Sequence, residues 1–102
     1  MKCHITNISI KEYIEDAGIV DEYDINQDDI IRIVIEKADT NNEFVFSGKL
    51  KDQSDYTILK TITGNANTTL IINTYDLLKI ECTVYDTTDN HVLLVVRGFD
   101  GW

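Results

Sequence analysis

The apolar pattern between Leu77 and Phe99 constrains this chain most strongly. Apolar and polar residues alternate from Leu77 to Tyr85, as expected for a strand with one buried face. The segment Val92–Val96 consists of five consecutive aliphatic residues, which is typical of a strand buried on both faces. Turn-forming residues at 87–90 separate the two segments, so the sequence predicts an antiparallel hairpin over 77–99. The expected inner face of its first strand carries Leu78, Ile80, Cys82 and Val84.

Two other segments have the same form, 30–50 around a turn at 39–42 and 56–73 around a turn at 64–67. In the first, centring the register on the turn pairs Ile35 with Phe46, so that apolar residues meet across the hairpin. A further strand is expected over residues 2–8. The chain of 102 residues is therefore predicted to be one mostly-β domain, 1–102, folded as an antiparallel β-sandwich or partly open barrel. We expect about six or seven strands, arranged in hairpins.

One short N-terminal helix is predicted over residues 10–17. Ser9 and Glu12 have the spacing of a capping box, in which each side chain accepts a hydrogen bond from the other residue's backbone N–H. Ile8 and Tyr13 are placed to form the hydrophobic staple that accompanies it. Gly18 then supplies a residue that ends helices readily.

Acidic residues are concentrated from Glu12 to Asp29, that is, in this predicted helix and in a predicted acidic connection over 18–29. The formal net charge of the chain is −9, which disfavours direct binding to nucleic acid or to anionic membranes. Between Glu12 and Asp29 there are eight acidic residues and no basic one. We predict that carboxylates of this segment bind a basic partner protein; the alternative is that they form only a solvated surface. The candidate partner-binding residues are Glu15, Asp16, Asp21, Glu22, Asp24, Asp28 and Asp29.

No residues in the sequence have the spacing of a catalytic site. The only histidines are His4 and His91, and neither lies near a nucleophile elbow or a glycine-rich phosphate loop. The cysteines, Cys3 and Cys82, do not have zinc-finger spacing, so buried thiols are expected rather than a zinc site. We therefore expect no enzymatic activity and no cofactor.

Calcium is the one cation that the sequence raises as an alternative. Asp24 begins a run of alternating oxygen ligands, but Asp29 and Ile35 stand where an EF-hand needs glycine and glutamate. The turns at 39–43 and 86–89 also carry Asp and Asn, which turns favour for backbone reasons. We expect no metal site, with a cation between these turns as the alternative.

The segment from Met1 onward does not resemble a signal peptide, and no apolar run is long enough to span a bilayer. The expected location is the cytoplasm, with reduced cysteines. A disulfide between Cys3 and Cys82 is the alternative. The chain has no proline and is rich in Ile, Asn, Asp, Lys and Thr, which fits a low-GC bacterium or its phage.

Three functional classes are consistent with these features. We expect a small acidic inhibitor of a basic nucleic-acid-handling protein such as a nuclease. Examples of this class are phage counter-defence proteins, including anti-CRISPR proteins and nucleic-acid mimics, and immunity-type proteins. The first alternative is a phage virion structural protein of the tail, baseplate or head, with self-association. The second alternative is a cation- or sugar-binding β-sandwich.

Overall fold

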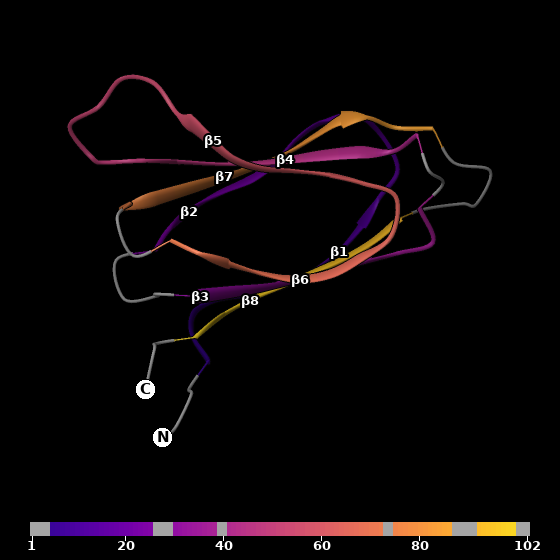
Figure 1. The fold of residues 1–102 in the computed structure, drawn as a ribbon, viewed down its shortest axis with the longest axis horizontal. Helices are drawn as coiled ribbons and strands as arrows, with labels where there is room; N and C mark the ends of the chain where they lie inside the picture. The colour runs from indigo at the N-terminus through magenta and orange to yellow at the C-terminus, as the bar shows by residue number, and fades with distance from the viewer. Residues whose placement is uncertain (1–4, 26–29, 39–40, 73–74, 87–91, 100–102) are drawn as a thin grey trace.

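Eight antiparallel strands form two packed sheets in the computed structural model, which describes residues 5–25, 30–38, 41–72, 75–86 and 92–99 (Figure 1). The described residues contain no helix. The predicted β-sandwich is therefore confirmed. The strands are β1 (Ile5–Ile14), β2 (Gly18–Asp24), β3 (Ile30–Glu36), β4 (Glu43–Lys49), β5 (Thr57–Thr63), β6 (Ala66–Ile71), β7 (Leu77–Val84) and β8 (Val92–Phe99).

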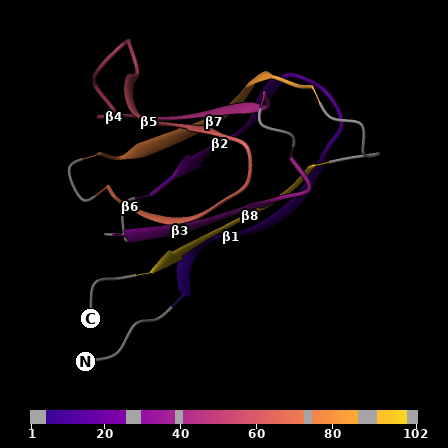
Figure 2. The ribbon, with the colours of Figure 1, turned by 45° about the vertical axis from the view of Figure 1, so that its right-hand side comes forward.

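Each sheet has four strands. Sheet A has the order β1-β8-β3-β6, and sheet B has the order β2-β7-β4-β5. The edge strands β1 and β2 lie on one side of the sandwich and are joined by the short bend at residues 15–17, while the edge strands β5 and β6 are joined by a turn at Gly64. Figure 2 shows the two layers from a second direction.

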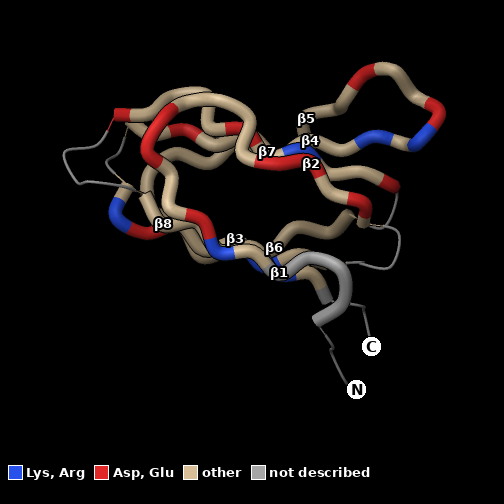
Figure 3. Tube along the Cα trace, turned by 180° about the vertical axis from the view of Figure 1, so that it is seen from behind, with Lys and Arg blue, Asp and Glu red and all other residues tan. Residues whose placement is uncertain are grey.

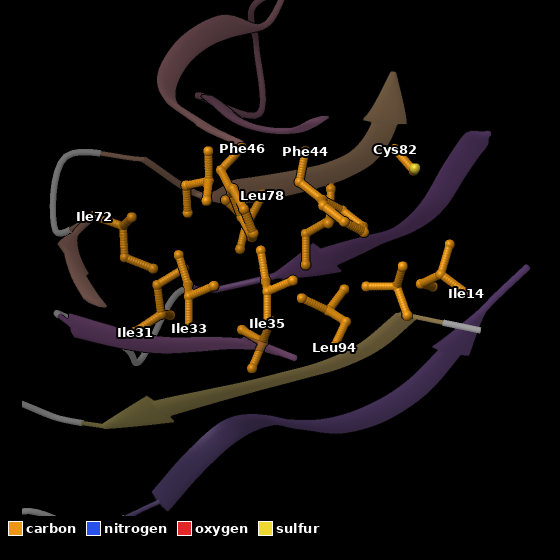
Figure 4. Packing of buried hydrophobic residues seen from close by; sticks show 14 of the residues in the cluster. Ile14, Ile31, Ile33, Ile35, Phe44, Phe46, Ile72, Leu78, Cys82 and Leu94 are labelled. Carbon is orange, nitrogen blue, oxygen red and sulfur yellow. The ribbon is translucent and has the colours of Figure 1, made fainter. Parts of the chain in front are cut away.

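The core lies between the sheets and is built from the alternating inner positions of their strands. Ile31, Ile33 and Ile35 of β3 are fully buried and point toward Phe44 and Phe46 of β4 in the opposite layer (Figure 4). Leu78, Ile80 and Cys82 of β7 are also fully buried, as the alternation predicted. Val84 is the exception, because it is exposed at the end of β7.

The predicted helix over 10–17 is wrong: most of this segment belongs to β1. Residues Ile10 to Ile14 pair one to one with Val96 to Val92 of β8, so Ile14 is buried in the core and Tyr13 points outward. The capping-box spacing is a local signal worth about 1 kcal/mol, and a helix of two turns is marginal by itself. Pairing with β8 competes against it with a full ladder of backbone hydrogen bonds. Gly18 has a φ of +140° and starts β2 instead of ending a helix.

The predicted acidic connection over 18–29 is also wrong for residues 18–24, which form the edge strand β2. This strand pairs with β7, and a bulge shifts the register between Ile19 and Asp21. Val20 and Tyr23 turn toward the core, where both are partly buried. The acidic residues are therefore carried by an edge strand with one unpaired side.

The three predicted hairpins over 30–50, 56–73 and 77–99 are wrong, because in each case the two strands lie in different sheets. Ile35 pairs with Ala66 and Leu94, whereas Phe46 pairs with Lys60 and Ile80. The hairpin that does form joins β4 to β5. A period-two pattern says which face of a strand is buried, and that face is equally well buried when the chain crosses to the opposite sheet.

Strand β8 lies in the middle of sheet A, but only one of its faces is covered. Val92, Leu94 and Val96 are fully buried between the sheets. Leu93 and Val95 point to the other side and are only half-buried. The expectation that the whole run is buried on both faces is therefore wrong for the isolated chain, since nothing in the described residues covers the outer face of sheet A.

Candidate functional site

The predicted acidic residues do not form one continuous surface. Glu15 and Asp16 lie in the bend between β1 and β2, and both are exposed. Asp21, Glu22 and Asp24 are exposed residues of β2. Asp28 and Asp29 lie outside the described residues. Figure 3 shows red acidic segments along the bend that leads from β1 into β2.

Glu22 belongs to a local network on the outer face of sheet B. The Tyr56 hydroxyl donates a hydrogen bond of 2.8 Å to Oε2 of Glu22. The ring of Tyr56 is also close to two ammonium groups, with its centroid 4.7 Å from Nζ of Lys79 and 5.3 Å from Nζ of Lys49. Burial and the neighbouring Glu22 raise the pKa of Tyr56 to about 12. Glu22 is therefore partly satisfied within the molecule, and it is a weaker candidate for partner binding than the sequence indicated.

The bulge places Asp21 opposite the inward residue Ile80, and Oδ1 of Asp21 accepts a hydrogen bond of 2.8 Å from the backbone N–H of Glu22. The carboxylate of Asp21 approaches the buried hydroxyl of Tyr23 and interacts with it. Burial raises the pKa of Tyr23 well above its usual range, and the carboxylates of Asp21 and Glu12 raise it further. Glu12 of β1 thus lies on the same side of the sandwich as Asp21.

Four carboxylates consequently gather where β1 bends into β2, and we call Glu12, Glu15, Asp16 and Asp21 the acidic corner. The bend encloses a shallow depression of about 270 Å³, lined by residues 12–20. Sequence reasoning omitted Glu12 because it assigned this residue to a helix cap. The signal that could have found it is its place at an inner position of the Ile10–Ile14 alternation, where an acid is tolerated only at a sheet edge.

The described residues contain no group of three or more His, Cys, Asp or Glu side chains placed to hold a metal ion. Cys3, His4 and His91 lie outside the described residues. Cys82 is a buried free thiol, and burial raises its pKa. A second depression, of about 470 Å³ at the Glu36 end of β3, has Glu36 as its one charged lining residue.

Described residues of the two turns that were the alternative cation site, at 39–43 and 86–89, lie side by side. They form hydrogen bonds directly with each other. Nδ2 of Asn42 donates to the backbone oxygen of Asp86 at 2.9 Å, and Oδ1 of Asn42 accepts from the Asp86 N–H at 2.7 Å. Nδ2 of Asn41 donates to Oδ2 of Asp86 at 3.2 Å. Asp39, Thr40 and residues 87–89 lie outside the described residues.

A second surface, which the sequence did not indicate, is the outer face of sheet A. We call it the open face. Its half-buried and exposed apolar residues surround the side-by-side arginines Arg32 and Arg97, which are Cα partners on β3 and β8. The acidic residue on the described strands of this face is Glu36, at one end. The residues that define the open face are Lys11, Tyr13, Ile30, Arg32, Val34, Thr69, Ile71, Leu93, Val95 and Arg97.

Of the residues that the structure describes, none belongs to a helix long and apolar enough to cross a membrane. No protein-family model matches the chain, and a search of curated proteins found no sequence match.

Two solved structures resemble this fold. The SPBc2 prophage-derived protein YomS superposes with a TM-score of 0.74 over 98% of this chain and 96% of its own, at 11% sequence identity. A protein from Bacillus endospore appendages, which form disulfide-linked pili, superposes with a TM-score of 0.50 at 16% identity, over 95% of this chain and 85% of its own. At these identities the likeness concerns the fold alone, and it extends over nearly the whole of this chain.

Proposed function

We propose that this chain is a non-enzymatic protein-binding module that serves as a structural component of a phage-type particle. The observation that carries the proposal is the open face of sheet A. Leu93 and Val95 of the central strand β8 are half-buried there, and Ile71 of β6 is 69% exposed. Apolar side chains gathered on one sheet face mark a surface for protein contact.

The comparisons and the surface of the molecule both support this choice over the other classes. One similar fold is prophage-derived, and the other comes from endospore appendages that form disulfide-linked pili. The depressions at residues 12–20 and at the Glu36 end of β3 are shallow, and the described residues hold no cluster of metal ligands, which is consistent with a protein that acts through surface contact. We expect the protein to fold in the cytoplasm before assembly.

Fractionation of particles tests this proposal. Particles from an induced culture of the strain that carries the gene are sedimented through a density gradient, washed at high salt and quantified by mass spectrometry. The expected result is a constant ratio of this chain to the other particle proteins across the peak. Recovery of all of this chain with small proteins at the top of the gradient would overturn the proposal.

A second function, inhibition of a basic nucleic-acid-handling protein, is favoured by the acidic corner. Four carboxylates around one bend create a local negative field that accelerates association with a basic surface and weakens as salt rises. The predicted residues that belong to the corner are Glu15, Asp16 and Asp21, whereas Glu22 is bonded to Tyr56. This function therefore depends on a smaller patch than a continuous mimic of a nucleic-acid duplex requires.

Capture experiments separate this second function from the first. The immobilised protein is compared with the triple variant Glu15→Gln, Asp16→Asn, Asp21→Asn. A control, Asp52→Asn with Asp55→Asn, also removes negative charge, but from the exposed loop after β4. The inhibitor function predicts that a nucleic-acid-binding protein is retained by the parent and the control and released by the triple variant. Equal retention of the nucleic-acid-binding protein by the parent, the control and the triple variant would contradict a role for the acidic corner.

A further inference from the structure

The open face carries an electrostatic arrangement that is unfavourable in the isolated chain. Arg32 and Arg97 are direct cross-strand partners, with Cβ atoms about 5 Å apart in such pairs. Like charges placed directly opposite each other destabilise a sheet. Neither guanidinium forms an ion pair within the described residues. Glu36 is four residues along β3 from Arg32, about 14 Å away at the usual rise of a strand.

Arg32 is held in a geometry that leaves it available to a ligand. Its Nε donates a hydrogen bond of 2.8 Å to Oδ1 of Asn67 on the neighbouring strand β6. Among the described residues, Nε is the guanidinium nitrogen that makes this bond, and the two terminal nitrogens have the spacing of the two oxygens of a carboxylate. Arg97 lies next to it and is exposed. The two side chains together form a cationic centre for an acidic group.

Apolar residues border this cationic centre on the same face. Val34 and Val95 are Cα partners two residues along the strands from the arginines, and Ile30 and Ile71 pair at the other end. Covering such residues removes apolar surface from water, which favours association. The five-residue aliphatic run of β8 has the pattern of a strand covered on both sides. None of the described residues provides the second cover, and we assign that cover to another molecule.

The acidic corner has the complementary charge but cannot reach the arginines of its own chain. Ile14, where β1 enters the bend, pairs with Val92, and Arg97 is five residues farther along β8. That spacing corresponds to about 17 Å, which exceeds the screening length of about 8 Å at physiological salt. A contact between corner and arginines must therefore be made between two copies.

We propose that the open face of sheet A binds the acidic corner of a second copy of this chain, so that copies associate head to tail. Carboxylates of Glu15 and Asp16 of one copy pair with Arg32 and Arg97 of the next, and the apolar residues around the arginines are covered. Each copy keeps one unused corner and one unused face. Such heterologous contacts produce rings when the rotation closes and filaments when it does not. This inference rests on the proposed structural function and specifies how the subunits join.

The test is light scattering and sedimentation velocity of the purified chain at rising concentration and at two salt concentrations. The parent is expected to form oligomers larger than dimers, with association weakened by salt. Two double variants each remove one half of the contact: Arg32→Gln with Arg97→Gln, and Glu15→Gln with Asp16→Asn. Each alone is expected to lower the association constant about tenfold or more. The control Lys51→Gln with Lys60→Gln removes two positive charges from sheet B and its loop and is expected to associate like the parent.

Mixing the two double variants distinguishes a head-to-tail contact from a symmetric one. An intact corner on the first variant meets an intact face on the second, so the mixture is expected to form one-to-one heterodimers and nothing larger. Circular dichroism and a melting curve show that both variants are folded. A parent that is monomeric at every concentration overturns the proposal, as does an arginine variant that associates normally. Binding of an oligonucleotide through the arginines without self-association also overturns it.

The outcomes separate this inference from the proposed function. If the chain is found in particles but the purified protein stays monomeric, a different particle protein covers the open face and only the head-to-tail contact is wrong. If the chain oligomerises through these residues but is absent from particles, the structural role in a phage-type particle is wrong.

Discussion

Asn42 connects three loops at one end of the sandwich. Its side chain is fully buried and makes the two hydrogen bonds to the backbone of Asp86, while its own backbone oxygen accepts from the Gly64 N–H at 3.0 Å. Asn42→Ala removes both side-chain bonds and leaves backbone groups of Asp86 without them. We expect the free energy of unfolding to fall by about 1–3 kcal/mol.

Urea denaturation measures this change against Asn41→Ala as the control. Asn41 is exposed and makes one longer bond to the Asp86 side chain. Its removal should cost less than about 0.5 kcal/mol. Equal midpoints for the two variants would show that the Asn42 bonds contribute no net stability.

Tyr56 predicts a loss of stability at alkaline pH. Its pKa is raised from the usual value near 10 in the unfolded chain to about 12 in the folded one, first by burial and then by Glu22. The contribution of the neutral Tyr56 hydroxyl to the free energy of unfolding is therefore fully present below pH 10, and it is lost as the pH rises from 10 to 12. We expect Tyr56→Phe to make the decline in unfolding free energy over this range shallower. Tyr13→Phe, at a 55% exposed position, is the matched control that also removes one phenol hydroxyl.

At the scale of the strand, β3 separates the core from the open face by single residues. Ile33 is fully buried, whereas the next residue, Val34, is half-buried on the outer side. Ile33→Asp is expected to unfold the domain, because it places an unpaired charge in the core. Val34→Asp is expected to leave it folded. Circular dichroism and thermal melting compare the two, and a folded Ile33→Asp variant would mean that the face assignment is reversed.

At the scale of the whole molecule, the fold depends on the last strand, β8, which pairs with the first strand, β1. Strand β8 pairs with β1 on one side and β3 on the other, and it supplies Val92, Leu94 and Val96 to the core. A chain ending at Asp86 is therefore expected to remain unfolded, without a cooperative melting transition. Adding a peptide of residues 87–102 should restore strand signal in circular dichroism. Cooperative melting of the truncated chain alone would contradict this dependence.

The candidate site was predictable only in part. The density of acids between Glu12 and Asp29 located a negatively charged region, and Glu15, Asp16 and Asp21 are exposed in it. No sequence signal distinguished Glu22 from the other acidic residues. Its carboxylate accepts a hydrogen bond from Tyr56, which is more than thirty residues away in the sequence. The role of all these residues in partner binding remains a prediction.

The sequence by itself determined the β class of this protein and the buried face of most strands, because side chains alternate with period two along any strand. Which strands would be neighbours was decided only by the tertiary structure. An inward-facing row is buried equally well by a hairpin and by a crossing to the opposite sheet, so the local pattern does not distinguish them. The placement of Arg32 beside Arg97, some 65 residues apart in the sequence, followed from that long-range pairing. The open face could therefore not be seen until β3 and β8 lay side by side.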